Sequence, residues 1–359
     1  MPPKSFTSDG NTKLASFNPY LLRCLELARS YGAAVEPNPR VGAVVVLEGR
    51  IIGEGAHEFF GGPHAEVNAI RSVKNTSLLP DSTLYVSLEP CNHHGKTPPC
   101  TQLILDCGIK NVVVGAVDPN PQMSGKSIDF LRSQGVNVVL ADDEFGFDEL
   151  NRHFEVNQRE KRPYIVLKWS ESADGLIAGL DQNGNPEPRA ISGEQVNRHF
   201  HRLRHELQAI LIGKNTALID NPSLTTRHWP GRNPLRIVLD QRLELPASLQ
   251  IFQGGTTVVI NAIKDEQIEH YRFWKVEDSH DLPNLLRKMY SELKIGSILV
   301  EGGCDLLQQF LDSDLWDEIY RCTSQNALQE GVSAPNLPIN LTSAGSITWG
   351  NDRVNYFLR

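Results

Sequence analysis

The most informative part of the sequence is a loop that reads Pro90-Cys91-Asn92-His93-His94-Gly95-Lys96-Thr97-Pro98-Pro99-Cys100. Upstream of it, the triplet His64-Ala65-Glu66 opens a segment with helical spacing of apolar residues. One imidazole and two thiolates, from His64, Cys91 and Cys100, make a ligand set that suits zinc. Three protein ligands leave the fourth tetrahedral position open, which is typical of catalytic rather than structural zinc. The sequence therefore predicts a catalytic zinc site.

Glu66 is predicted to be a catalytic residue of this site. It follows His64 by two positions and is not itself expected to bind the metal. Zinc lowers the pKa of a coordinated water toward about 7, and a neighbouring carboxylate can then carry a proton to a leaving amine. This chemistry is hydrolytic deamination. The spacing differs from the usual zinc deaminase pattern, because eight residues separate Cys91 from Cys100. The alternative is a structural zinc closed by His93 or His94.

The residues around the zinc motifs predict an α/β domain over residues 16–150. Segments with helical periodicity alternate with short apolar runs, which favours helices packed on a largely parallel sheet. Residues 1–15 are polar and expected to be disordered. We expect helices at residues 19–30, 64–74, 101–107 and 128–133, and strands at residues 41–46, 50–55, 83–88, 111–117 and 136–140.

A polar, charged stretch after residue 142 indicates a domain boundary, with residues 151–162 as linker and residues 163–359 as a second α/β domain. No Gly-x-Gly-x-x-Gly fingerprint follows a strand. Glu301-Gly302-Gly303 instead lies between a predicted strand and helix, where backbone N–H groups can receive a phosphate. We expect strands at residues 164–169, 209–213, 235–240, 256–260, 297–300 and 355–358, and helices at residues 192–207, 282–293 and 304–311.

Composition excludes several classes of protein. The 35 basic and 43 acidic residues give a net charge of −8, which disfavours a nucleic-acid partner. The apolar runs are too short to cross a bilayer, so no membrane role is expected. The six cysteines are too few for a disulfide scaffold, and the N-terminus lacks the apolar stretch of a secretory signal. We therefore expect a cytoplasmic protein with thiols kept reduced.

The zinc motifs, together with Pro37-Asn38-Pro39-Arg40-Val41-Gly42, resemble the deaminase half of the bifunctional riboflavin-biosynthesis deaminase/reductases. The resemblance implies a cytidine-deaminase-like α/β/α domain. The implied substrate is a ribosylated 2,5-diaminopyrimidinone 5′-phosphate, whose ring amine is hydrolysed with release of ammonia. By position within the motifs, the substrate-binding residues implied are Asn38, His57, His93, Lys96, Asp118 and Asn120.

The second half resembles the reductase half of the same family, in segments that begin at Lys168, Leu203, Gly213, Arg236 and Val300. The resemblance implies a dihydrofolate-reductase-like domain that uses NADPH to reduce the ribosyl group to ribityl. Lys168 falls on an active-site lysine. The substrate positions implied are Arg204, Leu224, Arg227 and Glu301, with the two arginines as phosphate anchors. The cofactor positions implied are Ser170, Thr216, Asp220, Gly302 and Gly303.

Three residues depart from the reductase pattern. Ala190 stands where an aromatic residue is usual, Ala173 replaces leucine, and Glu171 adds a charge. A deaminase-only enzyme with a degenerate reductase domain is therefore an alternative. Two further alternatives are a deaminase of nucleosides or nucleic-acid bases, and a zinc-stabilised binding module without turnover. The family resemblance also indicates a homo-oligomer.

Overall fold

The structure, a computed structural model, describes residues 18–92, 98–121, 123–141 and 146–359. The chain separates into two compact units. Unit 1 consists of Met1–Tyr31 and Arg40–Arg152, and unit 2 of Gly32–Pro39 and His153–Arg359. The expected disorder of residues 1–15 lies outside the described residues. None of the described helices has the length and apolarity to cross a membrane.

Gly32–Pro39 belongs to unit 2 although both of its flanks belong to unit 1. The carboxylate of Glu36, which is buried, lies 2.8 Å from His153 Nδ1 and also accepts a hydrogen bond from the Ser297 hydroxyl. These bonds hold the segment within unit 2.

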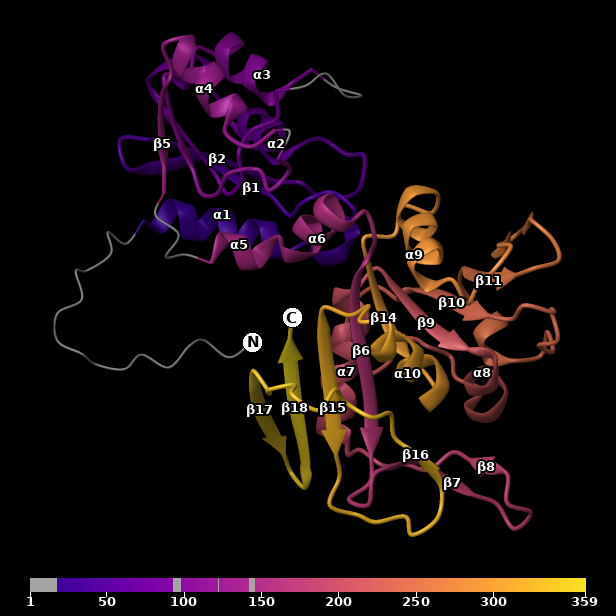
Figure 1. Ribbon diagram of the computed structural model, residues 1–359. Helices are drawn as coiled ribbons and strands as arrows, with labels where there is room; N and C mark the ends of the chain where they lie inside the picture. The colour runs from indigo at the N-terminus through magenta and orange to yellow at the C-terminus, as the bar shows by residue number, and fades with distance from the viewer. Residues whose placement is uncertain (1–17, 93–97, 122, 142–145) are drawn as a thin grey trace. The chain divides into compact units, whose positions relative to one another are not determined.

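Unit 1 is built on a mixed five-stranded sheet in the order β2-β1-β3-β4-β5 (Figure 1). β1 and β2 form an antiparallel hairpin, because Glu48 and Gly49 both have positive φ and make the tight turn that such a hairpin favours. β1 also pairs antiparallel with β3. The predicted largely parallel sheet is therefore correct only for β3, β4 and β5. The strands are β1 Gly42–Leu47, β2 Arg50–Ala56, β3 Thr83–Val86, β4 Asn111–Val114 and β5 Asn137–Leu140.

Helices cover both faces of this sheet, as the alternation of β1 requires. Ala43 and Val45 pack with buried residues of α2, α3 and α4, whereas Val44 and Val46 pack against Cys24 of α1. Unit 1 is thus an α/β/α layer structure. Its helices are α1 Pro19–Arg29, α2 Ala65–Ser72, η2 Thr76–Asp81, α3 Cys100–Asp106, α4 Lys126–Ser133 and α5 Phe147–Leu150.

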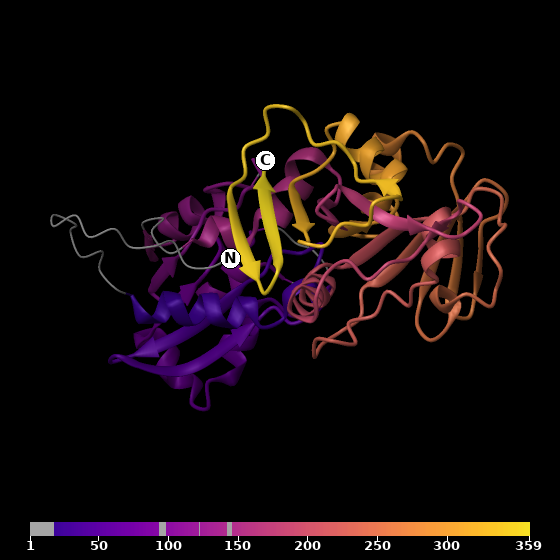
Figure 2. The ribbon, with the colours of Figure 1, turned by 90° about the horizontal axis from the view of Figure 1, so that it is seen from below.

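Unit 2 contains a ten-stranded sheet in the order β12-β13-β11-β10-β9-β14-β6-β15-β18-β17. The strands from β13 to β15 are parallel, and antiparallel strands complete both edges. Figure 2 shows the C-terminal hairpin of β17 and β18, in yellow. The strands are β6 Tyr164–Glu171, β9 Ala209–Gly213, β10 Leu235–Leu239, β11 Thr257–Asn261, β12 Glu266–Ile268, β13 Tyr271–Lys275, β14 Ser297–Glu301, β15 Glu318–Thr323, β17 Gly345–Trp349 and β18 Asp352–Leu358.

The alternation of side chains along β6 determines which of them face each layer of helices. Ile165, Leu167 and Trp169 pack with residues of α9 and α10, whereas Tyr164 and Val166 pack with α7. Lys168 shares the α7 face, since side chains alternate along a strand. The helices of unit 2 are η1 Gly32–Ala34, α6 Arg152–Glu160, α7 Glu194–Glu206, α8 Lys214–Asp220, η4 Gln250–Phe252, α9 Leu282–Ser291 and α10 Cys304–Asp312. A small second sheet contains β7 Leu176–Leu180, β8 Pro186–Glu187 and β16 Val332–Ser333.

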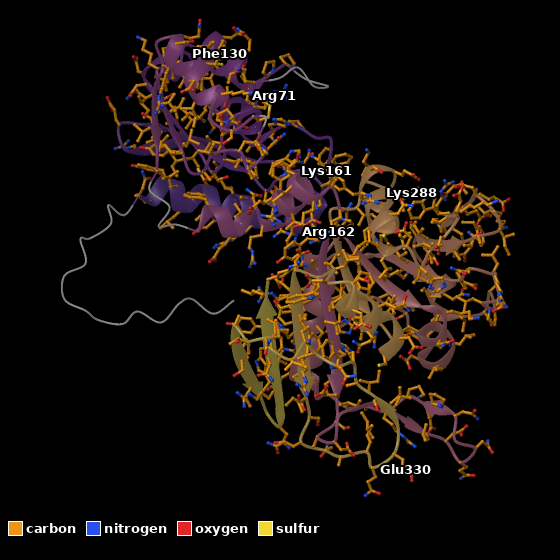
Figure 3. All side chains as sticks on the ribbon, in the orientation of Figure 1. Arg71, Phe130, Lys161, Arg162, Lys288 and Glu330 are labelled. Atoms are coloured by element: carbon orange, nitrogen blue, oxygen red, sulfur yellow. The ribbon has the colours of Figure 1, made fainter. Side chains whose placement is uncertain are left out.

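Residues 151–162, expected to be a linker, are mostly helical because α6 occupies Arg152–Glu160. The chain turns at Lys161, whose φ is +55°. Arg162, labelled with Lys161 in Figure 3, then forms a bidentate ion pair with Asp317, with N–O distances of 2.6 and 2.9 Å. This buried pair fixes the start of β6, since the Ile165 amide also donates to Asp317.

Candidate active sites

The three predicted zinc ligands come together in unit 1. His64 directly precedes α2, Cys91 follows β3, and Cys100 is the first residue of α3. His64 Nδ1 lies 3.5 Å from Cys91 Sγ and 3.4 Å from Cys100 Sγ, and all three ligand atoms lie within 4.8 Å of one another. A tetrahedral zinc with ordinary Zn–N and Zn–S bonds sets ligand atoms about 3.5 Å apart. The donor set and its spacing therefore fit zinc.

The electrostatics of this cluster favour a thiolate. The pKa of Cys91 falls to about 4, because Cys100 and His64 hydrogen-bond to its sulfur. The backbone N–H of Cys100 also donates to Cys91 Sγ, at 3.3 Å. The same contact with Cys91 raises the pKa of His64 to about 9. The thiolate of Cys91 is a charged ligand for a divalent cation, and His64 gives up its proton when it binds the metal.

Glu66 lies where the deaminase hypothesis needs it. It sits in the first turn of α2, is 3% exposed, and hydrogen-bonds with Cys100. Burial raises the pKa of Glu66 to about 6, so its carboxyl can exchange a proton near neutral pH.

The structure places the other predicted deaminase residues as follows. His57 is buried, its ring 5.6 Å from that of His64, with Nδ1 2.9 Å from the Pro63 carbonyl. Asp118 and Asn120 are half-buried, and the Asn120 amide donates to Asp118 Oδ1 at 2.8 Å. Asn38 is half-buried and lies in the segment that groups with unit 2. His93 and Lys96 lie outside the described residues.

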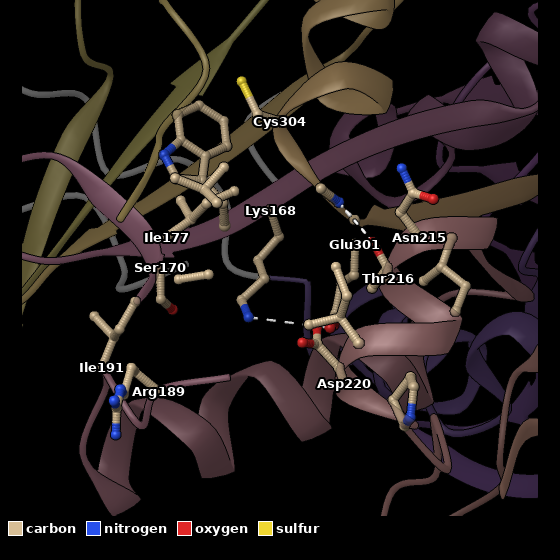
Figure 4. A pocket seen from close by; sticks show the side chains of 18 of the residues that line it. Lys168, Ser170, Ile177, Arg189, Ile191, Asn215, Thr216, Asp220, Glu301 and Cys304 are labelled. Atoms are coloured by element: carbon tan, nitrogen blue, oxygen red, sulfur yellow. Dashed lines mark hydrogen bonds and ion pairs between the residues drawn. The ribbon is translucent and has the colours of Figure 1, made fainter. Parts of the chain in front are cut away.

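A cavity of about 480 Å³ in unit 2 collects nine of the ten predicted reductase residues (Figure 4). It opens at the carboxyl ends of β9 and β14, where ligands of open α/β sheets commonly bind. Arg227 does not line it; this exposed side chain donates to the Ser223 hydroxyl at 3.3 Å. The predicted residues that line the cavity are Lys168, Ser170, Arg204, Thr216, Asp220, Leu224, Glu301, Gly302 and Gly303.

Three charged side chains form the centre of this cavity. Arg204 binds Glu301 through two bonds of 3.0 and 2.7 Å, and donates its remaining terminal nitrogen to the Thr225 carbonyl at 3.1 Å. Lys168 Nζ lies 4.0 Å from Glu301 and 4.2 Å from the centre of the Phe200 ring. Burial lowers the pKa of Lys168, and Glu301 opposes that effect. Glu301 and Thr225 accept three hydrogen bonds from Arg204, whose guanidinium has about five N–H donors, so its role as a phosphate anchor stays a prediction.

The turn at Gly302-Gly303 has the shape that a large cofactor needs. The Gly303 amide donates to Thr216 Oγ1 at 2.8 Å, which fixes the turn against α8. A Cβ atom on Gly302 or Gly303 would meet protein atoms only at 3.5 Å or beyond, and neither residue has a positive φ. Neither backbone strain nor internal packing therefore requires glycine here, and the absence of side chains leaves the backbone open to close approach by a ligand. These residues fit NADPH.

The two departures near this cavity have different consequences. Glu171 is buried on β6 and pairs with Arg321 while accepting a bond from Trp169 Nε1, so its charge is neutralised inside the protein. Ala190 lines the cavity and contributes only a methyl group to its wall. Sequence reasoning missed the left-handed conformation of Leu224, whose φ is +53°.

Comparison with known proteins assigns a family to each half of the chain. The model of the cytidine and deoxycytidylate deaminase zinc-binding region matches residues 16–116, and that of the RibD C-terminal domain matches residues 163–324. The riboflavin biosynthesis protein RibD of Aquifex aeolicus is 39% identical over 327 residues, which cover 89% of this chain and 90% of that protein. The chain belongs to the RibD family.

Two further RibD-family comparisons cover most of the chain. RibD of Escherichia coli is 35% identical over 84% of this chain and 85% of its own length. The structure of a diaminohydroxyphosphoribosylaminopyrimidine deaminase/5-amino-6-(5-phosphoribosylamino)uracil reductase from Thermotoga maritima is 35% identical. It superposes with a TM-score of 0.82, covering 95% of this chain and 97% of that one. As a RibD-family member, this chain is a zinc-dependent deaminase and an NADPH-dependent reductase of riboflavin biosynthesis. The predicted cytidine-deaminase-like and reductase domains are confirmed.

Proposed function

We propose that this chain deaminates the ribosylated 2,5-diaminopyrimidinone 5′-phosphate in unit 1 and reduces the ribosyl group of the product to ribityl in unit 2. The observation that carries this proposal is the pairing of a three-ligand zinc cluster beside Glu66 with a second cavity around Lys168. The relative from Thermotoga maritima, which covers nearly the whole chain, carries the same two activities in its name. The intact charged centre of unit 2 argues against the alternative of a deaminase with a degenerate reductase.

The deamination step assigns a role to each residue of the unit 1 site. His64, Cys91 and Cys100 hold zinc, which supplies the Lewis acidity that makes water a nucleophile near neutral pH. Glu66 takes a proton from the attacking water and gives it to the leaving amine, which departs as ammonia. Asn38, His57, Asp118 and Asn120, with His93 and Lys96, bind the substrate. Their amide, imidazole and carboxylate groups suit ribose hydroxyls, base edges and phosphate.

The reduction step uses the residues of the unit 2 cavity. Ser170, Thr216, Asp220, Gly302 and Gly303 hold NADPH, which supplies a hydride to the first carbon of the sugar. As the bond from that carbon to the ring oxygen breaks, the ring oxygen needs a proton. Lys168 donates this proton from its ammonium group.

Substrate contacts in unit 2 fall to the remaining predicted residues. Glu301 and Leu224 line the cavity beside Lys168, and Arg227 supplies an exposed guanidinium. Arg204 also lines the cavity as a proposed substrate residue, and it holds Glu301 with two hydrogen bonds.

We also propose domain limits of 16–150 for the deaminase and 163–359 for the reductase, joined by 151–162; both family matches lie inside these limits. A cytoplasmic location is supported by the six cysteines, since none of them forms a disulfide bond. Homo-oligomer formation is supported by the family resemblance alone.

The test is a coupled assay of the zinc-loaded chain on the pyrimidinone phosphate, with cytidine as the comparison substrate. We expect ammonia release and NADPH oxidation with the first substrate and neither with cytidine. Glu66→Gln should keep zinc and the reductase activity while ammonia release falls by at least about 100-fold, since one general acid–base group is removed. Ammonia release by Glu66→Gln at the wild-type rate would contradict the assignment.

A further inference from the structure

Glu89 is a buried carboxylate that neither active-site hypothesis uses. It is 6% exposed and lies two residues before the zinc ligand Cys91. Its carboxylate accepts hydrogen bonds from the backbone N–H groups of Asp118 at 3.1 Å, Gly125 at 2.8 Å and Ser127 at 3.0 Å. The Ser127 hydroxyl adds a fourth bond, at 2.5 Å.

These four bonds occupy the acceptor sites of an ionised carboxylate, which number about four. Among the described residues, no lysine, arginine or histidine forms a salt bridge with Glu89. Its charge is therefore balanced by N–H dipoles, including those at the start of α4. Hydrogen bonds to a charged acceptor are stronger than neutral ones, so this arrangement rigidly fixes the N–H groups that it binds.

Two of the four donors, the amides of Asp118 and Gly125, belong to the connection between β4 and α4, which we call the Asp118 loop (residues 115–121 and 123–125). The other two donors belong to Ser127, in the first turn of α4. The loop carries Asp118 and Asn120, both predicted to bind substrate, and Asp118 is held at its own amide by Glu89. The Glu89 backbone N–H also donates to the Ala116 carbonyl at 2.8 Å. Glu89 thus joins the segment that leads into Cys91 to the loop that carries the two substrate residues.

We propose that Glu89 is a positioning residue of the deaminase site, which sets where Asp118 and Asn120 stand relative to the zinc ligands. It touches neither zinc nor substrate and acts through the Asp118 loop. The proposal rests on the substrate roles proposed above for Asp118 and Asn120. Loss of Glu89 should therefore weaken substrate binding more than it slows the chemical step.

The experiment compares Glu89→Gln and Glu89→Ala with the wild-type chain. Gln places an amide NH₂ group against N–H donors, and Ala leaves all four donors unpaired. We expect the deaminase KM to rise at least about tenfold and kcat to fall less than about threefold, because substrate contacts rather than the proton-transfer group are misplaced. Zinc content should stay at one per chain, and the reductase activity of the same molecules should stay within about twofold of wild type.

Leu79→Ala is the matched control, because Leu79 is a buried core residue of unit 1 that lies outside both the Asp118 loop and the segment that leads into Cys91. It should destabilise unit 1 while leaving the deaminase KM within about twofold of wild type. Asp118→Ala in parallel tests the underlying assignment. If Asp118→Ala leaves the deaminase KM unchanged, the proposed substrate role of Asp118 is wrong. If Asp118→Ala raises this KM and both Glu89 variants leave it unchanged, only the positioning role of Glu89 is overturned.

Hydrogen exchange on the wild-type chain tests the proposal even if the Glu89 variants do not fold. The amides of Asp118, Gly125 and Ser127 donate to a buried acceptor, so they should exchange at least about 100-fold more slowly than unstructured amides. Unprotected exchange at these three amides would overturn the proposal.

Discussion

Glu301→Gln is the substitution whose effect on stability follows most directly from the structure. Glu301 is 12% exposed and binds Arg204 through two hydrogen bonds, with Lys168 Nζ 4.0 Å away. The charges of Arg204 and Lys168 outweigh the effect of burial and hold the pKa of Glu301 at about 2, compared with 4.5 for the free group. That difference corresponds to about 3 kcal/mol of unfolding free energy at neutral pH. Removing one partner from a buried ion pair leads to a similar expectation of about 3–5 kcal/mol.

The pH dependence has a definite sign. Because the folded-state pKa of Glu301 is depressed, its stabilising effect is complete well above pH 4.5 and is lost as the pH falls toward 2. The difference in stability between wild type and Glu301→Gln should therefore shrink on acidification. Between pH 7 and pH 4 we expect it to decrease by about 1 kcal/mol.

The assay exploits the distribution of tryptophan, since all five tryptophans lie in unit 2. Urea unfolding followed by intrinsic fluorescence therefore reports on the reductase unit. Glu266→Gln is the control: Glu266 pairs with Lys264 at 2.6 Å but is 46% exposed, so its loss should cost less than about 1 kcal/mol. If Glu301→Gln unfolds at the same urea concentration as Glu266→Gln, the reasoning from the buried charge cluster is wrong.

Three further outcomes are expected. Removal of zinc by a chelator should abolish ammonia release, whereas NADPH oxidation with the deaminated product as substrate should persist. The reason is that His64, Cys91 and Cys100 all lie in unit 1. Parallel loss of both activities would contradict this separation. Lys168→Met should lower the reductase kcat by at least about 100-fold without changing ammonia release, as measured by NADPH absorbance, and a wild-type kcat would remove Lys168 from the chemical step. Gly303→Ala should raise the KM for NADPH about tenfold. The urea midpoint of unfolding should stay near that of wild type, since the added Cβ atom would approach Thr216 only to 3.5 Å. A shifted midpoint with a normal KM would indicate that Gly303 has a packing role instead.

The zinc cluster was predictable from the chemistry of its residue types, because one imidazole and two thiolates form a typical zinc ligand set even though His64 lies 36 positions from Cys100. The elements of both units were largely predictable because the periodicity of apolar residues is a local signal. The parallel arrangement was overestimated in unit 1, because the two-residue turn at Glu48-Gly49 requires an antiparallel hairpin and β1 then also pairs antiparallel with β3.

Long-range pairing explains what the sequence did not reveal. Arg204 and Glu301 are 97 positions apart, and Glu89 lies 38 positions from Ser127. No local sequence pattern indicates that such distant side chains are in contact. Leu224 was predicted to lie at the site through the resemblance, but nothing in the sequence indicates its left-handed backbone.

The pairing of Arg204 also limits how unit 2 can bind a phosphorylated substrate. If Arg204 gave up its bonds to Glu301 in order to bind a phosphate, Glu301 would stay buried with the ammonium group of Lys168 at 4.0 Å. Separating a buried pair costs about 3–5 kcal/mol, which is comparable with the strength of the new contact itself. Arg227 faces no such cost, since it is exposed and its bond to the Ser223 hydroxyl is long, at 3.3 Å. We therefore expect Arg227 to bind the substrate phosphate at a lower cost than Arg204, although the two arginines look equivalent in the sequence.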